Sequence, residues 1–419
     1  YMADTKALKK QVCDMVDAMS GELIDISHAI HARPELAFHE HHAAKTLTGA
    51  LEENGLPVTR AAFGLETAYA SAFGSGGAEV AILSEYDALP GIGHACGHNI
   101  IATTGLGAAL ALSKLNGALP GRVRYLGTPA EEKGGGKELM AQFGAFDGLD
   151  AAMMVHPAGI NLATMPCICI SEVEVTYHGK SAHASAMPHA GINALDALIT
   201  AYQAIAQLRQ HIRPTERIHG IITKGGDAPN IVPEVAQAVF YVRAANAEDL
   251  AALKKRVTGC FEAGGIATGA GVQIRWAKAD YLDMKTSWPL AKAYEENSRM
   301  LGRDFFPLEK LPAGSAGSTD MGNVSHRVPS IHPMIASAPA HVVIHNPEFA
   351  RWAASDLGDK ACIDGAKALA MTAIDFLSDQ AMQEEAKEGF AKSAEFSARS
   401  VAAAFNPDGV QEIGGCGCC

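Results

Sequence analysis

Residues 80–99 read VAILSEYDALPGIGHACGHN. The stretch begins with four apolar residues, 80–83, a run whose length is typical of a buried strand. It continues into a loop with acidic, imidazole and thiol side chains, among them Asp87, Cys96 and His98. Thiolate and imidazole are good ligands of a borderline-soft metal such as zinc. In extended backbone Cys96 and His98 would point the same way, so this loop predicts a metal site.

The order of strands and helices around this stretch predicts a parallel sheet. Apolar runs at 123–126 and 152–155 also have strand length, and an apolar stretch at 101–115 between the first two strands has the character of a buried helix. Alternating strands and helices are typical of a mostly parallel sheet flanked by helices. We therefore expect an α/β fold for the first part of the chain.

The middle of the chain has a different order of elements. Strand and helix patterns follow one another as βαββαβ, at residues 171–177, 192–208, 217–223, 235–242, 247–262 and 272–277. This order is that of a ferredoxin-like unit. We predict an inserted ferredoxin-like lid domain at 171–280 and a metal-binding catalytic domain formed by 1–170 and 281–419.

Length, composition and charge limit the class of protein. The 419 residues are 48% hydrophobic and 19% charged, which suits two domains with a large core. A net charge of -12 without a basic stripe argues against nucleic acid as a partner. No apolar run is long enough to span a membrane. The nine cysteines are irregularly spaced and predict no disulfide framework, so we expect a cytoplasmic protein.

Side chains that bind metals follow all three predicted strands. Cys96 and His98 follow the first strand, Glu131 and Glu132 the second, and His156 the third. In open α/β sheets, binding sites gather beyond the carboxyl ends of the strands. A hydrolytic metal centre needs ligands that leave a position open, and a base that is not itself a ligand. The sequence therefore predicts a metal-dependent hydrolase.

The adjacent pair Glu131 and Glu132 can supply a metal ligand and a general base. In extended backbone the two side chains would face opposite ways, so that one binds metal while the other reaches a water. Taken alone, the pair would rather be a solvated surface charge beside Lys133. The glycines at 134–136 favour a close approach of this backbone to another group. A phosphate loop fits poorly, because the Walker pattern is missing and two carboxylates would repel phosphate.

Nearly the whole chain resembles a family of dinuclear metallopeptidases and amidohydrolases. The family includes aminoacylase, carboxypeptidase G, the auxin-conjugate hydrolases, aminobenzoyl-glutamate hydrolase and the Xaa-Arg dipeptidases, and the resemblance is strongest to the last two. Besides the segments above, it rests on blocks in the expected order: HARPEL (31–36), VHP (155–157), HGKSAHAS (178–185), NALD (193–196), NIVP (230–233), GSTDMG (317–322) and HNPEF (345–349).

The resemblance implies a set of site residues. Two divalent ions, zinc or manganese, would be held by Cys96, His98, Glu132, His156 and His345, with Cys96 as the bridge. Glu131 would be the general base, and Asp87 would support the ligands from behind. On the lid, His183 would polarise the scissile carbonyl, and Asn230 and Arg243 would hold the substrate carboxylate. The strand-end pattern alone does not distinguish His345 from His341.

The implied activity is hydrolysis of the amide bond in a small N-acyl amino acid or dipeptide that carries a free carboxylate. The resemblance also implies a homodimer formed through the lid, with His183 often supplied by the partner subunit. The sequence departs from many relatives at Glu85, where a histidine ligand stands in those proteins. Two alternatives remain: a metal- or peptide-binding homologue without catalysis, and a thiol redox protein that uses Cys96.

Overall fold

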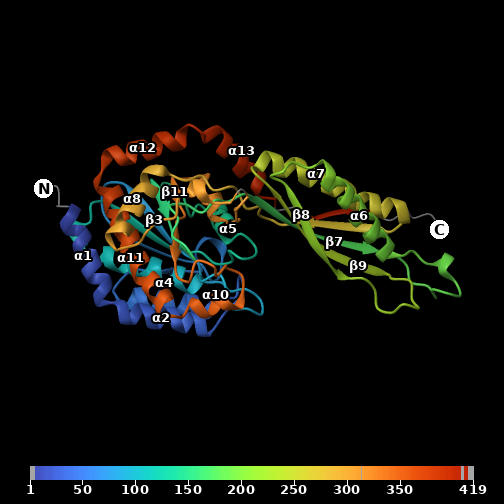
Figure 1. Cartoon of the computed structure of the whole chain (residues 1–419), viewed down its shortest axis with the longest axis horizontal. Coiled ribbons are helices and arrows are strands. Elements are labelled where there is room, and N and C mark those ends of the chain that lie inside the picture. Colours follow the sequence, from blue (N-terminus) through green and yellow to red (C-terminus); the bar gives the residue numbers. More distant parts are fainter. Residues whose placement is uncertain (1–4, 313, 407–409, 414–419) are drawn as a thin grey trace. The chain divides into compact units, whose positions relative to one another are not determined.

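The computed structural model describes residues 5–312, 314–406 and 410–413. The chain forms two compact units, of which the first comprises Tyr1–Cys167 and Met284–Ala398 and the second Ile168–Asp283 and Arg399–Cys419. Figure 1 shows the elements of both units along the chain. The cysteine-rich segment at 414–419, which the sequence offers as a metal-binding or flexible tail, lies outside the described residues.

The first unit is built on a six-stranded sheet in the order β1-β2-β4-β3-β5-β11. Its strands β4, β3, β5 and β11 run parallel, whereas β1 and β2 are antiparallel to their neighbours. The prediction of a mostly parallel sheet is therefore confirmed. The strands are β1 (Thr59–Arg60), β2 (Tyr69–Gly74), β3 (Glu79–Ser84), β4 (Arg122–Gly127), β5 (Ala151–Met153) and β11 (Ser330–Ile331), with β6 (His156–Ala158) and β12 (Met334–Ala336) as a separate parallel pair.

Helices cover both faces of this sheet (Figure 1). They are α1 (Thr5–Ala18), α2 (Ser20–Ala32), α3 (His41–Glu53), α4 (His98–Ser113), α5 (Gly136–Gln142), α8 (Trp288–Met300), α9 (Met321–Ser325), α10 (Pro347–Trp352), α11 (Asp356–Ser378) and α12 (Gln380–Ala391). The boundary between the two units falls within a further helix, α13 (Ala394–Ala404).

Strand β3 is apolar on both faces because it packs against helices on both sides. Val80 and Ile82 belong to the core cluster formed with α1, α4 and α11, whereas Ala81 and Leu83 belong to a second cluster with α5 and α9. All four residues are fully buried. Successive side chains of a strand point to opposite faces, so a continuous apolar run is the pattern that a central parallel strand requires.

The second unit is an antiparallel sheet packed against two helices. Its elements follow the predicted order: β7 (Cys169–His178), α6 (Ala194–Leu208), β8 (Arg217–Lys224), β9 (Val235–Ala244), α7 (Ala247–Thr268) and β10 (Gly271–Trp276). The strands pair antiparallel in the order β10-β7-β9-β8. The inserted ferredoxin-like domain is therefore confirmed. Across the described residues of both units, the helices are too short or too polar to cross a membrane.

The end of the chain differs from the predicted division. The sequence predicts that 281–419 completes the catalytic domain, but the structure assigns Arg399–Cys419 to the second unit. The cause is a short strand, β13 (Val410–Ile413), that pairs antiparallel with β10 at the edge of the sheet. Such pairing depends on the open edge of a distant strand, which a local sequence pattern does not reveal.

Candidate metal centre

The predicted site residues of the first unit follow neighbouring strands of the sheet. Cys96 and His98 follow β3, Glu131 and Glu132 follow β4, and His156 follows β5. Strands β4, β3 and β5 are adjacent and parallel. Their carboxyl ends therefore lie at one edge, which brings the three loops together as the strand pattern predicts.

The backbone at Cys96 and His98 is not extended, contrary to the prediction. Cys96 lies in a turn and His98 is the first residue of α4. Gly97 between them has a left-handed backbone with a φ of 75°. A Cβ atom at this position would lie 2.5 Å from Cγ of Pro157. Glycine therefore allows the tight turn that aims both side chains at one point.

The pair Glu131 and Glu132 also lies in a turn, so the prediction of extended backbone is wrong here as well. The chain turns at Ala130, whose φ is 61°. At Gly136 a Cβ would lie 1.7 Å from the carbonyl oxygen of Pro129, so only glycine fits. Glu131 is 6% exposed, which excludes the alternative of a solvated charge pair.

Two groups of candidate metal ligands share the thiol of Cys96. One group is Cys96, His98 and His156, and the other is Cys96, Glu132 and His345. Within each group the ligand atoms lie within 4.8 Å of one another. Sγ of Cys96 lies 3.3 Å from Nε2 of His156 and 3.3 Å from Nε2 of His345. One sulfur between two sets of nitrogen and oxygen donors is an arrangement that can hold two ions.

The two histidines contribute in different ways. Nδ1 of His156 donates to the carbonyl oxygen of Pro157 at 2.7 Å, which directs the unprotonated Nε2 toward Cys96. Burial lowers the pKa of His156 to about 3, so the ring is neutral. His345 has a positive φ of 64°, and its Nε2 lies 3.5 Å from Oε2 of Glu132. Neutral imidazole is the form that binds metal.

Asp87 supports the candidate ligands from behind. Its Oδ1 lies 3.0 Å from Nδ1 of His98, and its Oδ2 accepts the backbone N–H of Glu132 at 2.8 Å. Burial alone would raise the pKa of Asp87, but these hydrogen bonds hold it below its usual value. The ionised carboxylate thus fixes the tautomer of His98 and presents Nε2 to the centre.

Unpartnered buried atoms test whether the residues fit a metal. Nε2 of His98, Oε1 of Glu132 and Oε2 of Glu85 are buried and have no hydrogen-bond partner among the described residues. Nε2 of His98 lies 3.7 Å from the first oxygen of Glu132 and 3.5 Å from Oε2 of Glu85. Leaving such groups unsatisfied is costly, and a cation among them would satisfy them. The donor set therefore fits a metal centre.

The carboxyl groups of the site crowd one another. Burial, followed by the charges of Glu85 and Glu132, raises the pKa of Glu131 well above its usual value. Burial also raises the pKa of Glu132 to about 7. Oε2 of Glu131 lies 3.8 Å from Nε2 of His98. Excess negative charge in a buried site is the electrostatic counterpart of a bound cation.

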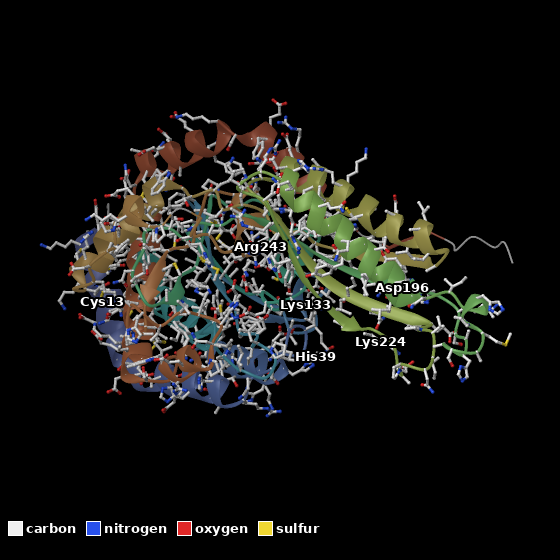
Figure 2. The ribbon with its side chains drawn as sticks, turned by 45° about the vertical axis from the view of Figure 1, so that its right-hand side comes forward. Cys13, His39, Lys133, Asp196, Lys224 and Arg243 are labelled. Atoms are coloured by element: carbon white, nitrogen blue, oxygen red, sulfur yellow. The ribbon has the colours of Figure 1, made fainter. Side chains whose placement is uncertain are left out.

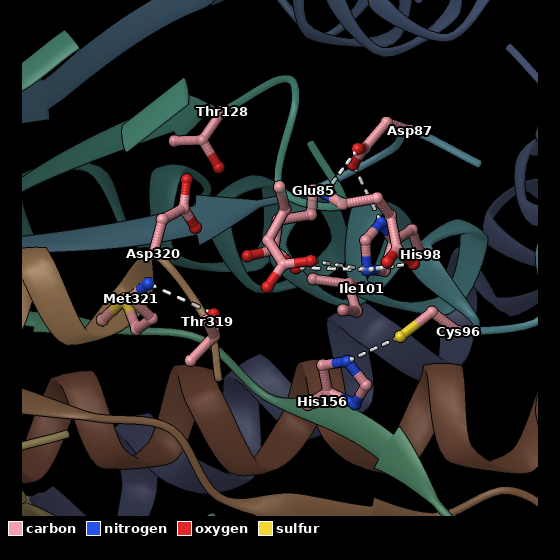
Figure 3. A network of polar contacts seen from close by, with 12 residues as sticks. Glu85, Asp87, Cys96, His98, Ile101, Thr128, His156, Thr319, Asp320 and Met321 are labelled. Atoms are coloured by element: carbon pink, nitrogen blue, oxygen red, sulfur yellow. Dashed lines mark hydrogen bonds and ion pairs between the residues drawn. The ribbon is translucent and has the colours of Figure 1, made fainter. Parts of the chain in front are cut away.

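A buried cluster of charges that the sequence did not reveal lies beside the site. Lys137 makes a short ion pair with Glu85, and its Nζ lies 2.6 Å from Oδ1 of Asp320. The side chains of all three residues are 0% exposed. Figure 3 shows Glu85 and Asp320 on the same side of the site as His98. At the position where many relatives have a histidine ligand, this chain thus places a carboxylate held by a lysine.

The predicted lid residues His183 and Asn230 lie on paired loops of the second unit. The backbone N–H of Ala184 donates to the carbonyl oxygen of Asn230 at 3.0 Å, and His183 forms a bridge with Ile231. Nδ1 of His183 accepts the backbone N–H of Ala186 at 3.2 Å. The proton of the neutral ring is therefore on Nε2, which makes exposed His183 a hydrogen-bond donor.

The structure does not bring Arg243 together with these two residues in one chain. Arg243 pairs with Arg217 near one end of the sheet, whereas Gln237 pairs with Lys224 near the other end. Figure 2 shows Arg243 and Lys224 at opposite ends. The eight residues from Val235 to Arg243 span about 26 Å. Nε of Arg243 donates to Nε2 of His219 at 3.3 Å.

An α/β unit with a cysteine-centred ligand cluster at its sheet edge, joined to an antiparallel insert, defines a metallohydrolase type of architecture. Comparisons with known proteins give the family. Residues 170–268 match the model of a peptidase dimerisation domain. The chain is 40% identical to the Xaa-Arg dipeptidase of Mus musculus over 402 residues, which cover 93% of each chain. The chain therefore belongs to the M20 peptidase family.

Two further relatives agree with this assignment. One of the two is a p-aminobenzoyl-glutamate hydrolase component from Escherichia coli (strain K12), which is 28% identical, with 90% of this chain and 93% of that protein covered. The crystal structure of a dinuclear metal-binding peptidase of the M20 family from Bacillus subtilis matches with a TM-score of 0.64 and 21% identity. That match covers 86% of this chain and 99% of the other, and it supports the fold.

Proposed function

We propose that this protein is a metal-dependent amidohydrolase that cleaves small N-acyl amino acids or dipeptides carrying a free carboxylate. The observation that carries the proposal is the pair of ligand groups that share Cys96 and lie beside Glu131. A thiol shared between two donor groups has no evident use in a purely structural role. The M20 relatives act on C–N bonds, in line with this chemistry.

The proposed centre contains two divalent ions, zinc or manganese. They would be held by the two groups that share the sulfur of one cysteine: Cys96, His98, Glu132, His156 and His345. When bound, the ions would polarise the scissile carbonyl and make a water molecule more acidic. The remaining chemistry falls to side chains of the protein.

Glu131 is the proposed general base. It is buried beside His98, and burial together with neighbouring carboxylates raises its pKa well above the usual value. A carboxylate with a raised pKa can take a proton from water and hold it. Glu131 then delivers this proton to the departing amine, which completes the cleavage of the amide bond.

The inserted unit is proposed to complete the site from a partner subunit. The unit matches a peptidase dimerisation domain, which favours a homodimer. Nε2 of His183 can donate a hydrogen bond to the carbonyl oxygen as negative charge develops there. Asn230, on the loop paired with that of His183, is placed to bind the substrate carboxylate. Arg243, at the other end of the sheet, would act at a different part of the bound substrate or in the other protomer.

The first substrates to test are dipeptides that end in a basic residue. The relative at 40% identity is described as an Xaa-Arg dipeptidase. A second class is the aroyl-glutamate type of amide, because another relative is described as part of a p-aminobenzoyl-glutamate hydrolase. The competing hypothesis of a non-catalytic binding protein requires that Glu131 be idle beside a complete set of ligand side chains. A redox role for Cys96 is disfavoured, because burial raises the pKa of its thiol.

The test compares two isosteric variants of adjacent residues. Amine release from a panel of dipeptides and N-acyl amino acids is measured for wild type, Glu131→Gln and Glu132→Gln after metal loading, with metal content determined on the same samples. We expect Glu131→Gln to keep the metal and lose at least about 100-fold in turnover. Glu132→Gln should bind less metal. Turnover by Glu131→Gln at the wild-type rate would refute the proposed base.

A further inference from the structure

Glu40 is a fully buried carboxylate to which the proposed chemistry gives no part. It directly precedes α3, yet its side chain does not cap that helix. The carboxylate of Glu35 does so instead, by accepting the backbone N–H groups of His42 and Ala43 at 2.8 and 3.1 Å. The burial of Glu40 therefore requires a different explanation.

The carboxylate of Glu40 connects its own segment to the loop that carries the proposed base. Its Oε1 accepts the backbone N–H of Phe38 at 3.0 Å and that of Ala130 at 2.9 Å. Its Oε2 accepts the hydroxyl of Thr67 at 2.7 Å. All three hydrogen bonds are buried or partly buried. Burial raises the pKa of Glu40 to about 7, so forming this contact has an energetic cost.

Both backbone groups that donate to Oε1 belong to residues with a left-handed backbone. Phe38 has a φ of 66° and Ala130 a φ of 61°. This conformation costs an L-residue free energy and persists only where the surroundings enforce it. The two segments also touch, since a Cβ at Gly134 would lie 2.5 Å from the Phe38 ring. Figure 2 shows the neighbours His39 and Lys133 close to each other.

Ala130 is the point at which the chain leaves β4 and turns into the Glu131 segment. The segment is anchored on either side by other contacts: Thr128 donates to the carbonyl oxygen of Ser84, and the N–H of Glu132 donates to Asp87. Among the hydrogen bonds of the described residues, the one from the N–H of Ala130 goes to Glu40. Without that acceptor, Ala130 would relax toward negative φ and rotate the carboxylate that follows.

We propose that Glu40 is a positioning residue for the reaction, holding Ala130 in its left-handed conformation and thereby directing the carboxylate of Glu131 toward the centre. The proposal rests on the proposed function for its kinetic consequence, whereas its structural part stands independently. A misplacement of about 1 Å in a reacting group can cost about 100-fold in rate. Loss of Glu40 should therefore lower kcat by about this factor and leave KM and metal content near the wild-type values.

Two variants separate the hydrogen bonds of Glu40 from its charge. Glu40→Ala removes both. Glu40→Gln removes the charge but keeps an oxygen for Phe38 and Ala130, while its amide can donate to the hydroxyl of Thr67. We expect Glu40→Ala to lose about 100-fold in kcat and Glu40→Gln to retain most of it. Equal losses in both variants would show that charge, not positioning, is responsible, and would overturn the proposal.

Rescue by glycine is the sharpest test, because glycine adopts positive φ without an external restraint. Ala130→Gly introduced into Glu40→Ala should restore at least about tenfold in kcat, with the single Ala130→Gly variant as the fourth corner of the cycle. The matched control is Glu35→Ala, which removes the neighbouring carboxylate that caps α3 without contacting Ala130. It should lose stability but not kcat. A kcat loss in this control equal to that of Glu40→Ala would contradict the proposal.

Amide hydrogen exchange provides a readout that does not depend on turnover. Peptides that cover residues 128–136 should exchange faster in Glu40→Ala than in wild type or Glu40→Gln, even if no substrate is found. Unchanged exchange in these peptides would overturn the positioning role. Faster exchange in a protein without turnover on any substrate would instead refute the proposed function alone. If Glu40→Ala does not fold, the same comparison of kcat and exchange between Glu40→Gln and wild type decides, since matching values are required.

Discussion

Replacement of Lys137 by methionine tests the buried charge cluster beside the candidate metal centre. Lys137 is 0% exposed and is paired with two fully buried carboxylates, those of Glu85 and Asp320. Removal of one member of a buried ion cluster leaves uncompensated charge, which costs about 3–5 kcal/mol. The backbone N–H of Lys137, which donates to Oδ2 of Asp320 at 2.9 Å, remains in the variant. We therefore expect Lys137→Met to fold and to lose about 3–5 kcal/mol.

The control for this variant is the same substitution at Lys360. Its Nζ lies 2.6 Å from Asp364, the same distance as between Lys137 and Asp320, but its side chain is 59% exposed. An exposed pair contributes about 0–1 kcal/mol. The free energy of unfolding is measured by urea denaturation, with the transitions of the two units fitted separately where they do not coincide. Equal losses in Lys137→Met and Lys360→Met would refute the account.

A partial rescue strengthens the test. In Lys137→Met the unpaired Glu85 is the neighbour whose charge has lost its partner, so adding Glu85→Gln should recover part of the lost free energy. The reason is that an isosteric amide carries no charge to desolvate. If Glu85→Gln made Lys137→Met still less stable, the two side chains would not be coupled by charge in the manner described.

Three further predictions concern the ligand set, the lid and pH. His345→Ala should lower the bound metal from two ions toward one while His341→Ala keeps both, as measured by elemental mass spectrometry; equal metal content in the two would remove His345 from the ligand set. His183→Ala should lose about 100-fold in kcat with metal content unchanged, whereas the exposed control His189→Ala should keep its activity. The folded-state pKa of Glu40 is raised from 4.5 to about 7, so the folded form binds the proton more tightly and stability falls as pH rises through this range. Between pH 5.5 and 8 the wild type should lose about 2 kcal/mol relative to Glu40→Gln in denaturation experiments, and a constant difference would contradict the shift.

The sequence predicted the meeting of the three loops because parallel strands place their carboxyl ends at one edge. Cys96, His98 and His156 could be selected on this basis alone. The backbone reasoning at Cys96 and at Glu131 was wrong, since both segments form turns that depend on Gly97 and on left-handed Ala130. The conclusion survived because a turn, like a strand, can bring side chains together.

Other features depend on contacts between distant parts of the chain. Asp320 reaches Lys137 across 183 positions, and Glu40 reaches Ala130 across 90. His345 was distinguished from His341 only by family resemblance, because its loop follows no strand of the central sheet. A lysine in a glycine-rich stretch carries no local sign that it will be buried. Only the assembled fold shows which charged residues are solvated and which are paired in the interior.

The most direct test of the central claim is anomalous X-ray scattering from crystals of the metal-loaded protein, recorded at the absorption edge of the added zinc or manganese. The account predicts two peaks at the edge of the sheet, both within bonding distance of Sγ of Cys96, one beside His98 and His156 and the other beside Glu132 and His345. A single peak, or peaks away from Cys96, would contradict a two-ion centre bridged by this thiol.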